Sequence, residues 1–243
     1  MRAYQGLAGS YDGLMEDAAY RRRASYLLRR LRPFQTEHIL DLGCGTGTIA
    51  CLLAAQGLRV TAADDSAEML AQAARKAESM ENPPLFIQQS MTRLRLPEPV
   101  DAVVSTIDAL NYLTSRRDLA AALGRVRKWL RPGGPFLFDV NTPAKLRRMD
   151  RQVWMDETED AFCVWRTFFS EKSGVCTYQV DLFQLRPDGA WERSFEEHRE
   201  RAWERETLEA ALHDAGFAGI SVYSDLTCRP PGPDDDRWQF LAV

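Results

Sequence analysis

The stretch Ile39-Leu40-Asp41-Leu42-Gly43-Cys44-Gly45-Thr46-Gly47 decides the fold of this 243-residue chain. Its first part belongs to an apolar run that begins at His38 and predicts a buried strand. Its second part places three glycines before the apolar segment 48–56, which predicts a helix. Because glycine has no Cβ atom, it lets a chain turn sharply and lets a ligand approach the backbone. The stretch therefore predicts a strand, a ligand-binding turn and a helix.

Strands and helices are expected to alternate after this stretch. Short apolar runs predict strands at 58–63, 85–88, 100–105 and 135–140, and helical spacing predicts helices at 67–79 and 119–130. Such alternation indicates parallel βαβ units and a Rossmann-like α/β sheet flanked by helices. Ligands of these sheets bind beyond the carboxyl ends of the strands.

The pattern changes after the fifth strand. Residues 159–203 lose helical spacing and predict three extended segments, 159–169, 175–185 and 191–203, which form an antiparallel β insertion. A helix at 205–215 and strands at 220–223 and 238–243 then complete a mostly parallel sheet of seven strands. We divide the chain into an N-terminal helical segment, a core, the insertion and a closing helix with two strands, at 1–35, 36–150, 151–203 and 204–243.

Composition excludes several classes of protein. The chain has 31 Lys and Arg against 35 Asp and Glu, a formal charge of −4, which argues against a nucleic-acid partner. Its five cysteines are odd in number and lack CxxC spacing, so neither a disulfide framework nor a metal site is expected. No signal-like or membrane-length apolar run is present, and we expect a cytoplasmic protein without a membrane partner. His38 and His213 are expected at the surface or at a helix end.

The glycine turn favours a nucleoside ligand. A dinucleotide-binding turn has the spacing GxGxxG, whereas the third glycine here comes one residue early and position 48 is Thr. Asp64 ends the next predicted strand, 21 residues after Gly43, where a carboxylate can accept hydrogen bonds from both hydroxyls of a ribose. The sequence contains no comparable signal for phosphates.

Two motifs together carry a family resemblance. Residues 39–47, with Val60-Thr61-Ala62-Ala63-Asp64-Asp65-Ser66-Ala67-Glu68-Met69-Leu70, resemble the first two motifs of class I S-adenosylmethionine-dependent methyltransferases. The resemblance covers about residues 34–140, and residues 205–243 fit the same fold. Segments 11–15, 108–113 and 138–142 are similar to a bacterial, small-molecule-type subgroup with an antiparallel insertion. The resemblance implies that the cofactor is S-adenosylmethionine and that the N-terminal segment caps the cofactor site.

The resemblance also implies roles for individual residues. Asp41 is expected near the cofactor's ammonium group, Asp64 at the ribose, and Asp65 beside the adenine. The remaining cofactor contacts are expected from the glycine turn, from the ends of the third and fourth strands and from the N-terminal segment, namely Gly43, Gly45, Ser90, Met91, Thr106, Ile107 and Tyr11. Ser90 stands where the family often has an acid. Helix capping is the alternative role for Asp41 and Asp65, and packing is the alternative for Tyr11.

Methyl transfer to an alcohol or a protonated amine also requires removal of a proton. The candidate bases follow the fourth and fifth strands or lie on the insertion, namely Asp108, Asn111, Tyr112, Asp139, Asn141 and His198. Strand alternation places Glu196, His198 and Glu200 on one face. Histidine between carboxylates is a plausible base or substrate anchor, although an exposed strand with cross-strand ion pairs is the simpler expectation.

The leading hypothesis is methyl transfer from S-adenosylmethionine to an oxygen or nitrogen of a small molecule. The alternatives are an RNA or protein methyltransferase and a catalytically silent S-adenosylmethionine-binding partner protein. A nicotinamide oxidoreductase is disfavoured by the glycine spacing. Aromatic residues of the insertion are numerous enough to supply a core layer, a substrate wall or a homodimer surface.

Overall fold

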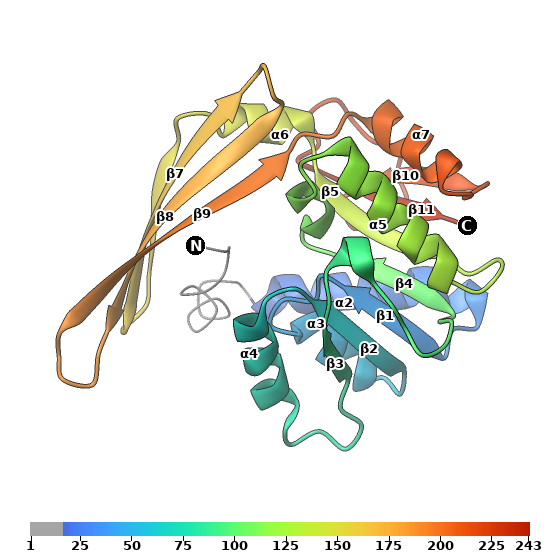
Figure 1. Ribbon diagram of the computed structural model, residues 1–243, viewed down its shortest axis with the longest axis horizontal. Helices are drawn as coiled ribbons and strands as arrows, with labels where there is room; N and C mark the ends of the chain where they lie inside the picture. Colours follow the sequence, from blue (N-terminus) through green and yellow to red (C-terminus); the bar gives the residue numbers. More distant parts are fainter. Residues whose placement is uncertain (1–16) are drawn as a thin grey trace.

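A seven-stranded sheet forms the centre of the computed structural model, which describes residues 17–243 (Figure 1). The strand order is β3-β2-β1-β4-β5-β11-β10, and β11 runs in the direction opposite to the other six strands. These strands are β1 (His38–Leu42), β2 (Arg59–Asp64), β3 (Leu85–Gln88), β4 (Ala102–Ser105), β5 (Phe136–Asn141), β10 (Ile220–Ser224) and β11 (Arg237–Ala242). The predicted α/β fold with a mostly parallel seven-stranded sheet is confirmed.

Helices cover both faces of this sheet. One face packs on α2 (Asp17–Leu31) and α3 (Thr48–Ala54), and the other packs on α5 (Arg116–Trp129) and α7 (Arg205–Asp214). Alternate residues of β1 supply the two cores, because Ile39 belongs to the first and Leu40 to the second. Burial on both faces explains why the central strands are continuous apolar runs in the sequence.

A local signal fixes the start of one helix on the sheet. Helix α4 (Ala67–Ala77) packs on β2 and β3 and begins where the Ser66 hydroxyl accepts a hydrogen bond from the Met69 amide. The remaining helical elements are short, namely α6 (Pro143–Arg148), η2 (Arg32–Phe34), η3 (Met91–Arg93) and η4 (Ala109–Tyr112). Helix α6 was not predicted, because six residues are too few to reveal a helical period.

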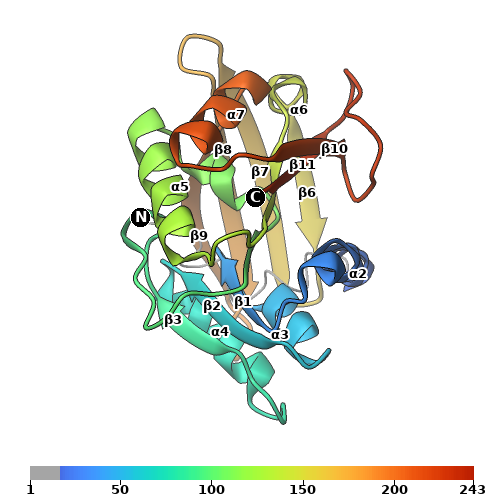
Figure 2. The same cartoon turned by 90° about the vertical axis from the view of Figure 1, so that its right-hand side faces the viewer.

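The insertion is a separate four-stranded antiparallel sheet that stands beside the core (Figures 1 and 2). Its strands, in spatial order, are β6 (Val153–Glu157), β7 (Ala161–Ser170), β8 (Val175–Leu185) and β9 (Trp191–Arg201). The three predicted segments are confirmed, but the prediction missed edge strand β6. That strand is held by pairing with β7 and by the stacking of Trp154 on Trp165, which are long-range contacts that its own residues do not signal.

Asn111 joins the insertion to the core. Its side-chain oxygen accepts a hydrogen bond from the Asn141 amide, and its side-chain nitrogen donates to the carbonyl oxygens of Asn141 and Arg201. Since Asn111 is fully buried, these bonds fix the end of β9 against β5 and η4. Asn111 is therefore structural, whereas it was a candidate for proton transfer in the sequence.

Two further features concern the described chain. No helix within residues 17–243 is long and apolar enough to cross a membrane. His38 is 5% exposed, so the expectation of a surface histidine is wrong. Its ring fills a site between the Arg59 guanidinium and the Thr61 hydroxyl, because parallel pairing of β1 and β2 brings these strands together.

Candidate active site

A cavity of about 520 Å³ opens at the carboxyl ends of the core strands. It is lined by the glycine turn and by residues that follow β2, β3 and β4. Eight of the predicted cofactor residues meet there, namely Gly43, Gly45, Asp64, Asp65, Ser90, Met91, Thr106 and Ile107. Tyr11 lies outside the described residues.

The glycine turn forms one wall of the cavity. Its three glycines have positive φ angles of 75°, 53° and 72°, which side chains rarely adopt. A Cβ atom on Gly43 would lie 2.5 Å from the Met91 side chain, whereas one on Gly45 would meet no atom within 4 Å. The first glycine therefore permits close packing, and the second leaves open space beside the backbone, as a bound nucleoside requires.

Asp64 lies at the centre of the wall. One carboxylate oxygen accepts the Gly45 amide at 2.8 Å, and the other accepts the Ser66 amide at 2.9 Å. Burial raises the pKa of Asp64 above its usual range, although these amides oppose that change. The carboxylate thus holds the glycine turn while also lining the cavity, which suits a group that binds two ribose hydroxyls.

Asp41 lies beneath the turn and does not line the cavity. The residue is 1% exposed, and one of its carboxylate oxygens has no hydrogen-bond partner. Burial and the nearby Asp64 carboxylate raise the pKa of Asp41 to about 7. Because Asp41 lies outside the cavity lining, the fit of the residues present to S-adenosylmethionine rests on Asp64 and on the open space beside Gly45.

The end of β3 provides a neutral wall. Asp65 is exposed, and its carbonyl oxygen accepts a hydrogen bond from the Gln88 side chain. The Ser90 hydroxyl lies 3.1 Å from the Thr92 hydroxyl, and the Met91 side chain packs beside Gly43. The segment after β3 thus offers hydroxyl and thioether groups to an adenine, and the Asp65 carboxylate after β2 lies next to them.

The segment after β4 faces the cavity from the opposite side. Thr106 and Ile107 line it, whereas the Asp108 carboxylate forms an ion pair with Arg237 at 2.6 Å. Arg237 also forms an ion pair with Asp139, which the sequence had offered as another candidate base. Neither residue was linked to Arg237 in the sequence, because no local pattern connects β11 with these strands.

Tyr112 connects the cavity to the insertion. It lines the cavity, and its hydroxyl is 3.2 Å from Nδ1 of His198. Nε2 of His198 is 3.1 Å from a carboxylate oxygen of Glu196. His198 is 2% exposed and Glu196 is 1% exposed, so the simpler expectation of an exposed strand is wrong. Docking of β9 against η4, which alternation alone does not reveal, buries this face of the strand.

Glu200 lies on the same face of β9 and is also buried. Its carboxylate accepts a hydrogen bond of 2.7 Å from the Asn141 side chain. Burial, reinforced by the Asp108 carboxylate, raises the pKa of Glu200 to about 8. The face of the insertion that meets the core therefore carries three buried ionisable groups, Glu196, His198 and Glu200.

Comparison with known proteins agrees with this geometry. A family profile described as "Methyltransferase domain" matches residues 39–134. The chain is 34% identical to "Putative methyltransferase YqeM" of Bacillus subtilis (strain 168), and the match covers 98% of this chain and 96% of the relative. It is 31% identical to "Putative methyltransferase GWCH70_2453" of Geobacillus sp. (strain WCH70), with 98% of both chains covered.

A solved structure extends the similarity to the whole architecture. An S-adenosylmethionine-dependent methyltransferase from Clostridium acetobutylicum ATCC 824 is 25% identical and superposes with a TM-score of 0.87. The match covers 99% of this chain and 98% of that one, so it includes the inserted sheet. On the strength of these similarities, the chain belongs to the class I S-adenosylmethionine-dependent methyltransferases.

Proposed function

We propose that the enzyme methylates an oxygen or nitrogen atom of a small molecule held between the cofactor cavity and the inserted sheet. The observation that carries this proposal is the hydrogen-bonded chain Tyr112–His198–Glu196, which begins at the cavity wall. Such nucleophiles lose a proton when they are methylated, and a buried histidine beside a carboxylate provides a place for it.

The hydrogen bonds define a direction for proton movement. An ionised Glu196 carboxylate accepts hydrogen bonds, so Nε2 of His198 carries the proton in this tautomer. Nδ1 then accepts a hydrogen bond from the Tyr112 hydroxyl, which faces the cavity side. Tyr112 can take the proton of the acceptor as it passes its own to His198, and Glu196 stabilises the resulting imidazolium.

Positioning supplies most of the remaining rate enhancement. When bound, S-adenosylmethionine supplies a methyl group on a positively charged sulfur, which leaves as a neutral thioether. The walls formed by the glycine turn and by residues 106–107 hold the acceptor and donor in line, and such orientation contributes about 7–11 kcal/mol in favourable systems. Proton removal by the His198 chain adds roughly 10²–10⁴-fold.

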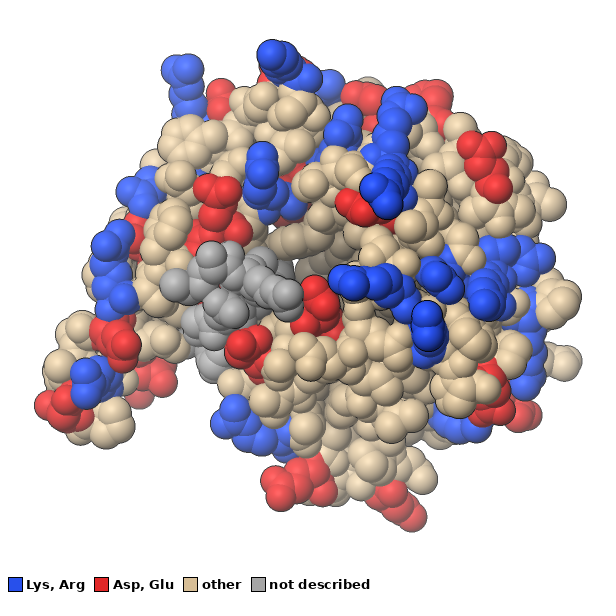
Figure 3. Space-filling model, viewed as in Figure 1, with Lys and Arg blue, Asp and Glu red and all other residues tan. Residues whose placement is uncertain are grey.

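The surface favours a small acceptor. The formal charge of the chain is −4, and on the face drawn in Figure 3 acidic and basic side chains both occur over the insertion and the core, with basic side chains gathered on the core at the right of the view. The inserted sheet also stands over the carboxyl ends of the strands (Figure 1), which limits the space for a macromolecule. These features disfavour the RNA methyltransferase alternative.

The test is methyl transfer from labelled S-adenosylmethionine to a mixture of small alcohols, carboxylic acids and amines. We expect product with the wild type, a loss of roughly 10²–10⁴-fold in kcat for His198→Ala, and a comparable loss for Tyr112→Phe, because His198 reaches the acceptor through the Tyr112 hydroxyl. Glu197→Ala is the matched control, because Glu197 is the exposed neighbour of His198 on the opposite face of β9. Cofactor affinity should stay unchanged in all three variants.

Two results would contradict the proposal. Full activity of His198→Ala on every oxygen and nitrogen acceptor would remove the histidine from the reaction. Tight cofactor binding without product from any small acceptor would favour a macromolecular substrate or the silent partner protein.

A further inference from the structure

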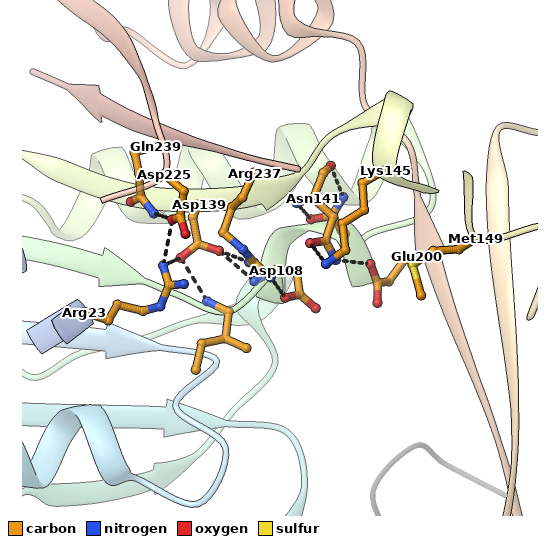
Figure 4. Close-up of polar contacts among 12 residues, drawn as sticks. Arg23, Asp108, Asp139, Asn141, Lys145, Met149, Glu200, Asp225, Arg237 and Gln239 are labelled. Carbon is orange, nitrogen blue, oxygen red and sulfur yellow. Dashed lines mark hydrogen bonds and ion pairs between the residues drawn. The ribbon is translucent and has the colours of Figure 1, made fainter. Parts of the chain in front are cut away.

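Asp139 lies outside the Tyr112–His198–Glu196 chain, yet four donors contact its carboxylate at the carboxyl end of the core strands (Figure 4). It is fully buried at the end of β5. It accepts hydrogen bonds from the Ile107 amide at 3.0 Å, the Asp108 amide at 2.9 Å and the Arg23 guanidinium at 2.9 Å, and it pairs with Arg237. Four donors occupy its oxygens, so Asp139 cannot also serve as the base.

The two amides belong to a strained turn. Ile107 has a φ of 58° and Asp108 has a φ of 53°. Left-handed backbone is rare for residues other than glycine, and it is an outlier for a β-branched residue such as isoleucine. Among the described residues, these are the only adjacent non-glycine residues with positive φ. Such a turn persists only where its surroundings enforce it.

The turn touches the cofactor cavity directly. Ile107 lines the cavity, as do Thr106 before it and Ala109 after it. Ala109 also lies against the glycine turn, because a Cβ atom on Gly43 would come within 2.8 Å of the Ala109 side chain. A shift of the turn would therefore change the shape of the cavity on the side opposite Asp64.

The arginines extend this arrangement to distant parts of the chain. Arg237, from β11, bridges Asp139 and Asp108 and so fixes the side chain of the turn as well as its backbone. Arg23 comes from α2, the helix whose Tyr20 also lines the cavity. Burial alone would raise the pKa of Asp139, but the two guanidiniums and the two amides hold it below its usual range.

We infer that Asp139 is a positioning residue of the cofactor site: its carboxylate holds the left-handed Ile107–Asp108 turn against the cavity and ties that turn to α2 and β11. The neutral side chain of asparagine would present an N–H group to these donors and would lose both ion pairs. The turn would then relax, and the cavity would bind S-adenosylmethionine less well.

The chain offers a matched control at the other end of the sheet. The Asp101 carboxylate also accepts hydrogen bonds from two consecutive amides, those of Glu37 at 3.0 Å and His38 at 2.8 Å, and it also pairs with an arginine, Arg131. Neither amide belongs to a residue with positive φ, and none of the four residues lines the cavity. Asp101→Asn therefore alters two amide contacts and one ion pair, against two amide contacts and two ion pairs at Asp139, at a place remote from the cofactor.

The experiment measures cofactor affinity by calorimetry in Asp139→Asn, Asp101→Asn and the wild type, together with hydrogen–deuterium exchange of the peptide that contains residues 106–110. We expect Asp139→Asn to weaken S-adenosylmethionine binding about tenfold or more and to speed exchange in that peptide. Asp101→Asn should lower stability without either change. Arg23→Gln, which removes one donor and keeps Arg237, should weaken binding by about threefold and covers the case in which Asp139→Asn does not fold.

The inference is wrong if folded Asp139→Asn binds the cofactor as the wild type does, or if Arg23→Gln does so with unchanged exchange. It is also wrong if Asp101→Asn weakens binding as much as Asp139→Asn, because the loss would then follow general stability. Calorimetry with the cofactor needs no methyl acceptor, so these outcomes are independent of the proposed function.

Discussion

Asp101 and Asp139 use one arrangement of hydrogen bonds at opposite ends of the same sheet, with different consequences. Each accepts two consecutive backbone amides and pairs with arginine. At the amino end the amides lead into β1 through ordinary backbone, whereas at the carboxyl end they belong to a left-handed turn on the cavity wall. The comparison teaches that the role of such a carboxylate depends on the segment it holds.

The two ends of the sheet also differ in how far their ion pairs are exposed to water. The amino-end pair of Arg59 and Glu98 is largely open to water, and exposed pairs of this kind contribute little to stability. At the carboxyl end Asp139 and Arg237 are buried together. Removing one partner of a buried pair leaves the other uncompensated, so changes there should have larger effects.

Asp64→Ala, at the carboxyl end, should have the largest effect. We expect S-adenosylmethionine affinity to fall by about 100-fold, because two hydrogen bonds to a charged carboxylate are worth about 1.5 kcal/mol each. Calorimetry measures the change, and Glu98→Ala at the amino end should leave affinity as it is. An Asp64→Ala protein that binds with the wild-type Kd would rule out the ribose contact.

Asp101→Ala tests the amino end by stability. The variant leaves the Glu37 and His38 amides and Arg131 without their acceptor, so the free energy of unfolding should fall by about 2 kcal/mol. Urea denaturation measures this loss, and calorimetry should give an unchanged Kd for the cofactor. If the Kd rises, the two ends of the sheet are coupled and the comparison above fails.

Much of the fold could be predicted because its signals are local. All five residues of β1 are buried, so the strand appears as an apolar run, and the glycine turn and Asp64 follow from short spacings. Edge strand β6 could not be predicted in this way. Its stability depends on pairing with β7, and its Val153 and Met155 side chains are exposed.

The candidate site likewise contains residues with local sequence signals and residues that only long-range contacts bring together. The predicted cofactor residues after β1 and β2 lie within one pair of motifs, whereas Tyr112 and His198 are 86 residues apart. Alternation could place His198 beside Glu196 and Glu200, but only docking of the insertion through Asn111 buries them. Arg237 carries no local signal, because its partners are distant in sequence: Asp139 lies on β5 and Asp108 lies between β4 and η4.

Glu200→Gln should change how stability depends on pH at the carboxyl end. The folded pKa of about 8 exceeds the usual 4.5, so the folded protein favours the protonated acid, and stability is lost as pH rises through this interval. Glutamine keeps an oxygen that can accept the Asn141 bond and does not ionise, so stability at about pH 8 relative to about pH 7 should improve by roughly 1 kcal/mol. Urea denaturation across this range is the measurement, and a pH dependence equal to that of the wild type would show that Glu200 does not stay protonated.

His38→Gln should give the smallest effect, with the opposite sign, at the amino end. Burial and the neighbouring Arg59 guanidinium lower the pKa of His38 below 6.5, so the folded protein favours the neutral ring. Stability is therefore complete above pH 6.5 and is lost as pH falls through the folded pKa. Glutamine does not titrate, so the variant should lose less stability than the wild type, by under about 1 kcal/mol, between pH 7 and pH 5. Parallel urea curves at these two pH values measure the difference, and Arg59→Gln, which removes the cationic neighbour, should raise the folded pKa of His38 and make the loss smaller. If the His38→Gln and wild-type curves shift equally, the ring is not held neutral, and the two ends of the sheet do not differ in the sign of their response to pH.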